Sequence, residues 1–526
     1  MKKLANADQM KRIDGYSIEK IGIPSLVLME KAALSVALEI KREIIGQKFS
    51  NNKILAVCGV GNNGGDGVAA LRILKEWGYE GAVLLVGDEN KASEQMQVQL
   101  SIARMLSIPV MNYRELADKH FEWSEYTVVI DAIFGIGLSK EVTGIFEEVI
   151  TKINVVCSQN KEACKVVAVD IPSGIHASTG KVMGNAVKAD VTVTFGINKL
   201  GIVLYPGCEY AGEVKVEDIG FPQLAVEQAD IDTFCYEKED IKQLLPERKR
   251  DSNKGTYGKV LVIGGSENMA GACCFAAKAA YTIGAGLVKV MTEKVNRIIV
   301  QTILPEALLC TYEDSTIEEE KEMILKELEW ATVIVLGPGL GKKQSAKYLV
   351  DWVLEYAKVP VIIDADGLNL IAEDGGFERV SQKENLILTP HLKEMERLTG
   401  DLISEIKQDI VSYAKTKMTD AKSILVLKDS RTIVCNGKRS YINISGNNGM
   451  AKGGSGDVLT GIIAGLLAQG MDCFEAAALS VYLHGLAGDC VVKECSQYSL
   501  LAGDLIWGLK KEIKENERVL SDLCRD

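Results

Sequence analysis

Two segments of the chain, 53–74 and 259–280, share one order of features: a lysine, a short apolar run, a glycine-rich turn and an alanine-rich stretch. A short continuous run of β-branched and aliphatic residues is typical of a strand buried on both faces of a sheet. Each segment therefore predicts the first strand–turn–helix unit of an α/β domain. Beyond this opening the spacings diverge, so we do not interpret the segments as repeats.

Further apolar runs alternate with helical stretches in both halves of the chain. Strands that alternate with helices predict parallel sheets covered by helices on both faces. The predicted strands are 82–86, 127–130, 165–169 and 191–195 in the first half, and 287–291, 332–336, 359–363, 385–388 and 423–427 in the second. Because 526 residues exceed the size of one growing core, we expect two domains, 1–228 and 229–526.

Charge and composition exclude several classes of protein. A net charge of −12 works against general adhesion to nucleic acid or anionic membranes. The first 15 residues contain no apolar segment of a secretory signal, and the apolar run 458–471 is too short for a membrane span, so it predicts a buried helix. The 13 cysteines form no C-x-x-C pair and the four histidines show no zinc spacing. We expect a cytoplasmic protein with reduced thiols and no zinc.

The glycine-rich turn after the first strand carries unusual polar groups. Residues 59–64 match the G-x-G-x-x-G pattern, which alone is a weak sign of dinucleotide binding. The continuation places Asn62, Asn63 and Asp66 among glycines, so the loop can approach a polar ligand closely. A tight turn that merely needs glycine is the simpler interpretation, but it does not account for two amides and a carboxylate.

Two further strand ends in the first half are polar. Asp131 precedes the run 132–138, and Asp170 precedes Ile171-Pro172-Ser173-Gly174. Because ligands of open parallel sheets bind beyond the carboxyl ends of the strands, we expect Asn63, Asp131 and Asp170 to converge. Each aspartate alone is also explained as a helix cap. A pocket of amide, carboxylate and hydroxyl oxygens suits a hard cation or a hydroxylated ligand.

The most distinctive run of the chain is the glycine-rich segment 446–461. Its glycines allow backbone N–H groups to point at one anion, and the following helix adds the positive end of its dipole. Asp457, placed beside a phosphoryl group, is suited to deprotonate or orient an acceptor hydroxyl. The alternative is an aspartate that only caps the helix.

Other strand ends in the second half also carry polar residues. Residues 337–343 lack the spacing of a P-loop but follow a strand and are expected to line a cleft. Asp364 and Asp366 follow one predicted strand, and His391 follows the next, so we expect His391 in the cleft rather than in the core. Lys428 ends a further strand and either contacts a nucleotide phosphate or lies on the solvated surface.

Together these motifs resemble those of the bifunctional NAD(P)H-hydrate repair enzymes over nearly the whole chain. GNNGGDG, DAIFGIGL and VDIPSG are similar to the epimerase domain, which has a Rossmann-like three-layer fold. GKVLVIGGS, LGPGLG, DADGLNL, LTPH and NNGMAKGGSGDVLTG are similar to the dehydratase domain, which has a ribokinase-like α/β fold. The resemblance implies that the first domain interconverts the R and S epimers at the hydrated C6 of the nicotinamide ring. The second dehydrates the S epimer with ADP, giving AMP and phosphate.

The resemblance also implies roles for individual residues, with Asp170 and Asp457 as the catalytic groups. The hydrated dinucleotide, NADHX or NADPHX, is expected in the epimerase at Asn62, Asn63, Gly64, Gly65, Asp66, Gly135, Ile136, Gly137, Leu138, Ser139, Lys140, Glu141 and Asp170. K⁺ is expected at Asn63, Asp131 and Ser173. In the dehydratase the hydrate is expected at Ala272, Gly339, His391 and Asp457. ADP, with Mg²⁺ bridging its phosphates, is expected at Lys428, Asp429, Ser430, Arg431, Thr432, Gly454, Ser455 and Gly456. A homo-oligomer is also expected.

Some positions depart from the family pattern, and other functions fit parts of the sequence. Leu392 and Lys393 stand where Pro-Gly is usual, Asp429 where Gly is usual, and Asn448 and Lys452 where Pro and Thr are common. These departures leave the preference between ADP and ATP open. A small-molecule kinase of the ribokinase class, which releases a stable phosphorylated product, remains an alternative. So does a non-catalytic nucleotide-binding first domain. An NAD-dependent dehydrogenase would need a proton-relay residue that the motifs do not provide.

Overall fold

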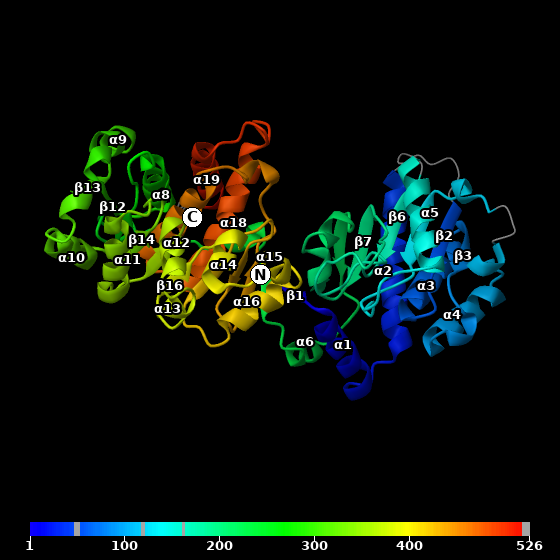
Figure 1. Cartoon of the computed structure of the whole chain (residues 1–526). Coiled ribbons are helices and arrows are strands. Elements are labelled where there is room, and N and C mark those ends of the chain that lie inside the picture. The colour runs from blue at the N-terminus through cyan, green and yellow to red at the C-terminus, as the bar shows by residue number, and fades with distance from the viewer. Residues whose placement is uncertain (47–52, 117–120, 160–163, 518–526) are drawn as a thin grey trace. The chain divides into compact units, whose positions relative to one another are not determined.

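The computed structural model describes residues 1–46, 53–116, 121–159 and 164–517, and the chain forms two compact units (Figure 1). The N-terminal unit comprises residues 3–231, and the C-terminal unit comprises the residues from 232 onward together with Met1 and Lys2. The boundary expected from the sequence lies three residues earlier, after residue 228. The turn after α6 (Gln223–Gln228) buries Ala229 against Met10 and Ile13 of α1 (Ala7–Gly15), and so belongs to the N-terminal unit.

The N-terminal unit is built on a parallel sheet with strand order β4-β3-β2-β5-β6-β7-β9. Its central strands are buried on both faces, which explains their continuous apolar runs. The strands are β2 (Lys53–Cys58), β3 (Glu80–Leu85), β4 (Val110–Asn112), β5 (Val128–Ala132), β6 (Lys165–Val169), β7 (Val191–Phe195) and β9 (Glu213–Glu217). The four strands predicted after the first apolar run lie in β3, β5, β6 and β7.

Helices cover both faces of this sheet and make three layers. One core contains residues of α2 (Ser25–Gly46), α3 (Asn62–Glu76) and α4 (Glu94–Met105), and the core on the opposite face contains residues of α5 (Ile145–Gln159). From β2 the chain builds the sheet toward β4, and from β5 it builds toward β9. The strand order therefore reverses between β2 and β5, and this point is where ligands bind in open α/β sheets.

A short N-terminal segment, which the sequence analysis did not predict, is anchored at the carboxyl ends of these strands. Helix α1 begins at Asn6, whose side chain accepts the Gln9 backbone N–H while the Gln9 side chain accepts the Asn6 N–H. Before it, β1 (Lys2–Ala5) pairs in parallel with β8 (Asn198–Lys199). A π-helical turn, Tyr16–Lys20, follows α1. The pairing keeps α1 beside Lys199, just beyond the end of β7.

The C-terminal unit contains a larger mixed sheet in the order β13-β12-β11-β14-β15-β16-β17-β18-β19-β10. The pairs from β13 to β17 are parallel, whereas β18 is antiparallel to both of its neighbours. The strands are β10 (Thr233–Cys235), β11 (Lys259–Ile263), β12 (Leu287–Glu293), β13 (Leu308–Tyr312), β14 (Val333–Leu336), β15 (Val361–Ile363), β16 (Leu386–Leu388), β17 (Ile424–Leu427), β18 (Ile433–Cys435) and β19 (Ser440–Ile442). The five strands predicted after the first apolar run of this half are present.

The helices of the C-terminal unit form two groups. One group shares a large core with the sheet and consists of α8 (Ala270–Ile283), α17 (Ser455–Ala468), α18 (Cys473–Val491) and α19 (Ala502–Asn516). In the other group neighbouring helices pack on one another, and it includes α10 (Lys321–Trp330), α11 (Gln344–Tyr356), α12 (Asp366–Glu373) and α14 (Leu392–Thr399). Smaller helices include α9 (Arg297–Ile303) and α16 (Ile410–Met418).

Helix α17 contains most of the run 458–471 that predicted a buried helix. A Cβ atom at Gly461 would lie 2.1 Å from the backbone oxygen of Ala276, so α17 and α8 approach more closely than any other residue would allow. This packing fixes the N-terminal turn of α17, where Asp457 lies. Among the described residues no helix is both long and apolar enough to cross a membrane. The twelve described cysteines are free thiols.

Candidate active sites

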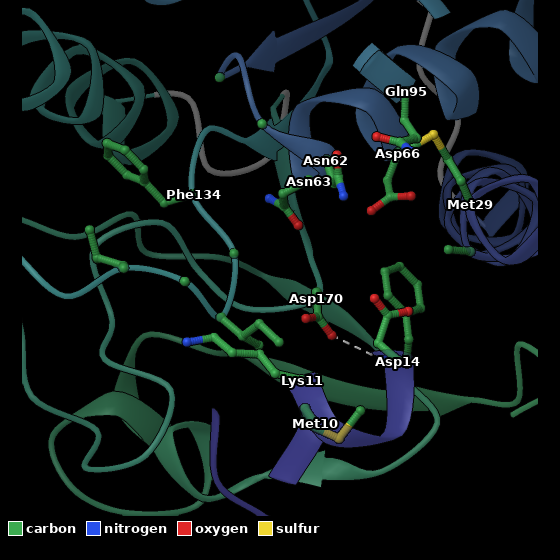
Figure 2. Close-up of a pocket in the computed structure, with 18 of the residues that line it drawn as sticks. Met10, Lys11, Asp14, Met29, Asn62, Asn63, Asp66, Gln95, Phe134 and Asp170 are labelled. Carbon is green, nitrogen blue, oxygen red and sulfur yellow. Dashed lines mark hydrogen bonds between the residues drawn. The ribbon is translucent and has the colours of Figure 1, made fainter. Parts of the chain in front are cut away.

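A cavity of about 620 Å³ lies at the reversal point of the N-terminal sheet (Figure 2). Its walls come from the loop after β2, the loop after β5, the end of β6 and helix α1. Of the residues predicted to bind substrate, those that line it are Asn62, Asn63, Asp66, Gly135, Ile136, Gly137, Leu138, Ser139, Lys140 and Asp170. Asn63 and Asp170, two of the three residues expected to converge, line the cavity, whereas Asp131 is not part of its lining.

Three predicted residues lie outside the lining of this cavity. A Cβ atom at Gly64 would lie 1.9 Å from the Gly59 backbone oxygen, and one at Gly65 would lie 2.8 Å from Cε of Met29. These two glycines therefore allow close packing at the start of α3. Glu141 is exposed.

Asp170 is held rigidly at the end of β6. Its φ angle is +66°, a left-handed conformation that aspartate and asparagine adopt more readily than most residues. The side chain is 13% exposed, and Oδ1 accepts hydrogen bonds from Thr194 Oγ1 (3.1 Å), the Phe195 N–H (3.2 Å) and Lys199 Nζ (2.5 Å). Within the described residues Oδ2 accepts no hydrogen bond. Asp170 therefore presents one oxygen of an anchored carboxylate to the cavity.

Lys199 is the partner of Asp170 and was not predicted from the sequence. Its side chain is 1% exposed, and besides Asp170 it donates to Thr194 Oγ1 and the Phe195 carbonyl oxygen, each at 2.8 Å. Burial lowers the pKa of Lys199, against the opposing effect of Asp170. Lys199 lies on the two-residue strand β8, which has no motif. A lone lysine in an apolar context was the only available signal.

Two more carboxyl groups face the same cavity. Burial raises the pKa of Asp66 well above its usual value, and the negative charges of Asp170 and Asp14 add to the effect. Burial also raises the pKa of Asp14, again with a contribution from Asp170. Figure 2 shows the carboxyl groups of Asp14, Asp66 and Asp170 directed into one space. The cavity therefore combines an anchored carboxylate with two carboxyl groups whose pKa values are raised by burial and by nearby negative charge.

The three residues expected to bind K⁺ form a connected group beneath the cavity. Asp131 is fully buried, and its Oδ2 accepts the Ser173 N–H at 2.8 Å. Ser173 Oγ accepts the Phe134 N–H at 2.9 Å. A Cβ atom at the next residue, Gly135, would lie 3.0 Å from Oδ1 of Asn63. A run of backbone and side-chain contacts thus joins all three residues.

Two features of this group fit a cation. Burial raises the pKa of Asp131 to about 6, although hydrogen bonds from Ser173 and Ile133 oppose the shift. Within the described residues Asp131 forms no ion pair. The amide nitrogen of Asn63 is buried without a hydrogen-bond partner, and a 180° turn of the amide would place its oxygen there. A monovalent cation would supply the positive partner that the buried Asp131 carboxylate lacks within the described residues.

In the C-terminal unit the glycine-rich run leads into the first turn of α17. Gly454 adopts φ +92° and stands at the N-cap, so the free N–H groups of the first turn follow it directly. The preceding loop is fixed by Asp489 of α18, which accepts the Gly446 N–H at 2.8 Å and Asn447 Nδ2 at 2.9 Å. Asn448 begins a short 3₁₀ turn, and Lys452 donates to the Tyr498 carbonyl oxygen. The departures from the family pattern are therefore accommodated within an ordered loop.

A buried polar network stands behind this turn. Asp364 Oδ1 accepts Lys428 Nζ at 2.7 Å and Thr389 Oγ1 at 2.8 Å, and Oδ2 accepts Thr460 Oγ1 at 2.9 Å. Burial alone would raise the pKa of Asp364, but Lys428 and the two hydroxyls outweigh it and lower the pKa. Burial alone would lower the pKa of Lys428, but Asp364, Glu394 and Asp457 together outweigh this effect and raise it. Lys428 is thus a buried, paired group, and the alternative of a solvated surface lysine is wrong.

Asp457 is close to this network but does not pair with it. Burial raises the pKa of Asp457 to about 7, the negative charge of Asp364 adds to the shift, and Lys428 opposes it. A Cβ atom at Gly456 would lie 3.4 Å from Lys428 Nζ and 3.7 Å from Asp364 Oδ2. Asp457 therefore lies beside an ion pair, with a proton affinity suited to acid–base work near neutral pH.

The remaining predicted residues form two groups around this turn. On one side a Cβ atom at Gly339 would lie 3.0 Å from the Cβ of Ala272, and the Gly341 N–H donates to Asp366 at 2.9 Å. On the other side His391 pairs along the backbone with Lys428 in an isolated bridge. Its side chain is 52% exposed, which confirms that His391 is not in the core.

The expected nucleotide segment 428–432 forms the turn between β17 and β18. The Thr432 hydroxyl donates to the Asp429 carbonyl oxygen at 3.1 Å, and Arg431 donates to that of Ile444 at 3.0 Å. Asp429, a departure from the family pattern, pairs with Lys407 at 3.7 Å. Ser455 and Gly456, also expected to hold ADP, lie in the first turn of α17. The two segments meet through Lys428 and Gly456.

Both units of the chain match known families. A family model described as NAD(P)H-hydrate dehydratase matches residues 260–510, and one described as YjeF-related protein N-terminus matches residues 25–201. The chain is 36% identical over 520 residues to the bifunctional NAD(P)H-hydrate repair enzyme of Moorella thermoacetica, covering 96% of this chain and 95% of that protein. It is 35% identical over 520 residues to the enzyme of that name from Thermofilum pendens, covering 97% and 96%.

Among solved structures, a ribokinase-like superfamily protein from Enterococcus faecalis is 30% identical, with a TM-score of 0.50. The match covers 55% of this chain and 98% of that protein. It supports the ribokinase-like fold expected for the C-terminal unit, and the three-layer parallel sheet agrees with the Rossmann-like fold expected for the N-terminal unit. The chain therefore belongs to the family of bifunctional NAD(P)H-hydrate repair enzymes, in which an epimerase domain precedes a dehydratase domain.

Proposed function

We propose that the N-terminal unit interconverts the R and S epimers of NADHX and NADPHX in the cavity beside Asp170. The hydrate is a hemiaminal, because its hydroxyl is on the ring carbon next to the nitrogen. Such a carbon is inverted when the ring opens and closes with proton transfers. The observation that carries this proposal is the anchored Asp170, which keeps one open oxygen toward a cavity lined by Asn62, Asn63 and Lys140.

K⁺ would be held by Asn63, Asp131 and Ser173, and would neutralise the buried Asp131 carboxylate. The support is the unpartnered amide nitrogen of Asn63 together with an Asp131 that has no cationic side chain. Because Ser173 also bonds to the backbone of Phe134, a cation there would fix the loop 133–140 that lines the cavity.

This cation site predicts a pH dependence. K⁺ competes with a proton for Asp131, so its affinity should be constant well above pH 6 and should fall as the pH drops through the pKa of about 6. The increase in melting temperature caused by K⁺, with choline as the control cation, should be larger at pH 8 than at pH 5. Asp131→Asn should lose that increase at both values. An equal K⁺ effect at both values in the wild-type protein would exclude Asp131 as a ligand.

In the C-terminal unit we propose that ADP phosphorylates the hydrate, with Asp457 as the base. Asp457 takes the proton of the C6 hydroxyl while the terminal phosphoryl group moves to that oxygen and AMP leaves. Phosphate is then a good leaving group, and elimination across C5 and C6 restores the dihydronicotinamide ring. The observation that carries this step is the position of Asp457 in the first turn of α17, beside the anion-attracting N–H groups.

The phosphates of ADP would lie against 454–456 and the turn 428–432, and the hydrate against Ala272, Gly339 and His391. Asp366 fits Mg²⁺. Its Oδ2 accepts the Gly341 N–H, and no described residue donates a hydrogen bond to its other oxygen. Proteins hold Mg²⁺ with one or two carboxylates and substrate phosphates. Mg²⁺ would neutralise charge on the transferring phosphate.

We also propose that the protein is cytoplasmic and forms a homo-oligomer. The exposed Val27, Leu34 and Leu38 of α2 support the oligomer.

The epimerase assignment is tested with Asp170→Asn, which retains a residue that tolerates the left-handed backbone. This change should lower the R-to-S interconversion of pure R hydrate by about 100-fold or more, because it removes the proton acceptor. Dehydration of pure S hydrate by the same preparation should be unchanged, which serves as the internal control. Interconversion at the wild-type rate would show that Asp170 has no catalytic role, and would favour a non-catalytic N-terminal unit.

A further inference from the structure

Helix α1 contributes a wall of the epimerase cavity from a part of the chain that carries none of the family motifs. Met10, Lys11 and Asp14 all line the cavity. The match between the N-terminal unit and its family model begins at residue 25, after this helix. The helix is nevertheless fixed, by the capping box at Asn6 and by burial of Met10 and Ile13 against α6. Asp14 is therefore a placed group and not part of a frayed terminus.

Three carboxyl groups share this cavity, and their surroundings differ. Asp170 accepts hydrogen bonds at Oδ1 from three donors, including Lys199, which hold its carboxyl group in place. Within the described residues neither Asp14 nor Asp66 forms a side-chain hydrogen bond or an ion pair. In Figure 2 the carboxyl group of Asp14, from α1, points into the same space as those of Asp66 and Asp170. Asp14 is thus open to a ligand and close to a fixed carboxylate.

The charged groups that line the cavity determine how Asp14 titrates. They are Lys11, Asp14, Asp66, Lys140, Asp170 and Lys199. Lys199 is already paired with Asp170, and Lys11 lies 3.7 Å from the exposed Asp8. Burial and then the charge of Asp170 raise the pKa of Asp14. The negative charge of Asp170 therefore works with burial against the ionisation of Asp14.

Building on the epimerase function proposed above, we propose that Asp14 is the proton donor of the epimerase and acts together with Asp170, the proton acceptor. Asp170 takes the proton of the C6 hydroxyl, the C6–N1 bond breaks to give an aldehyde, and the electron pair of that bond takes the proton of Asp14 at N1. Rotation about C5–C6 exposes the other face of the aldehyde. N1 then attacks C6 and returns its proton to Asp14, while Asp170 returns its proton to the oxygen. No oxidant or further reactant is needed.

Asp14 fits this role better than Asp66 does. A group that gives and regains a proton in each turnover works best with a pKa near the working pH. Burial raises the pKa of Asp66 well above its usual value, which works against its giving up a proton and suits it to donate a hydrogen bond. Asp66 also belongs to the glycine-rich turn at the start of α3, whereas Asp14 approaches from a separate helix.

The proposal is tested with the full-length enzyme and pure R hydrate. Asp14→Asn should lower kcat for R-to-S interconversion by about 100-fold or more, with KM changed only a few fold. Asp14→Glu, which keeps the proton, should recover a measurable part of the rate. The matched control is Glu19→Gln, an exposed carboxyl in the turn after α1, which should match the wild type. Dehydration of pure S hydrate should be the same in all four proteins.

The pH profile separates a proton donor from a merely structural residue. Because Asp14 must be protonated, the wild-type kcat/KM should fall on the alkaline side as Asp14 ionises, and Asp14→Asn should lack that decline. An Asp14→Asn variant with wild-type kcat, or one whose alkaline decline is unchanged, would overturn the proposal. Failure of the wild-type enzyme itself to interconvert R and S hydrate would instead overturn the epimerase function on which the proposal depends.

Discussion

Replacement of Asp457 by asparagine is expected to lower the turnover of the dehydratase by about 10²–10⁴-fold. The change keeps the size of the side chain and removes only its ability to accept the proton of the hydrate hydroxyl. The Asp364–Lys428 pair and the N–H groups of α17 remain in place, so the affinity for ADP should change only a few fold. Calorimetric titration with ADP, alongside dehydration of pure S hydrate, measures the two quantities separately.

The pH dependence of the wild-type enzyme tests the role of Asp457 as a base independently. Asp457 acts as a base only when ionised, and its raised pKa is about 7. The kcat/KM for dehydration should therefore fall as the pH drops below about 7, and Asp457→Asn should show a low, flat profile in this range. R-to-S interconversion by the same variant is the control for folding. A variant that retains most of its dehydration turnover would show that Asp457 only caps its helix.

Replacement of Lys428 by methionine is expected to have the largest effect on stability. The Lys428 and Asp364 side chains are 19% and 2% exposed, and removal of one partner leaves the other as an unpaired buried charge. Such changes cost about 3–5 kcal/mol of unfolding free energy. The lowered pKa of Asp364 means that the pair stabilises the fold above the ordinary aspartate pKa, and that this contribution is lost as the pH falls through the lowered value.

The matched control for this variant is Lys422→Met. Lys422 pairs with Glu384 at 2.8 Å, but the two side chains are 54% and 71% exposed, so its loss should leave stability unchanged within error. Urea unfolding followed by circular dichroism compares the two variants near pH 7. Equal midpoints for Lys428→Met and Lys422→Met would contradict the buried network. ADP binding should be lost only in Lys428→Met, because Lys428 lies against Gly456 at the start of α17.

The parallel sheets could be predicted from the sequence because strands buried on both faces leave continuous apolar runs. Strands β5 and β16 are examples, and each was located to within about two residues. Strands β18 and β19 were missed, since each has only three residues and depends on pairing with its neighbours. Helix α1 was missed for a related reason, because its burial comes from α6, which lies far away in the sequence.

The residues of the candidate sites also fall into two groups: those that a local sequence pattern locates, and those that depend on tertiary packing. Asp131 lies near the end of a strand, Asp170 and Asp364 directly follow strands, and Asp457 lies in the first turn of a helix. A general rule about parallel sheets therefore locates these positions from the order of strands and helices alone. Lys199 and Asp14 lie on short elements that reach the cavity only through tertiary packing, and no local pattern identifies them. The burial that raises the pKa of Asp457 and the pairing that holds Lys428 likewise depend on residues distant in sequence.

The most direct test of the account is a coupled assay in which the full-length enzyme acts on a mixture of R and S hydrates of NADH. With ADP, Mg²⁺ and K⁺, the account predicts complete conversion to NADH, with one AMP and one phosphate formed for each NADH. Asp14→Asn and Asp170→Asn should stop at the fraction that was initially S, and Asp457→Asn should yield almost no NADH. A stable phosphorylated product without NADH, or a wild-type reaction that stops at the S fraction, would contradict the account.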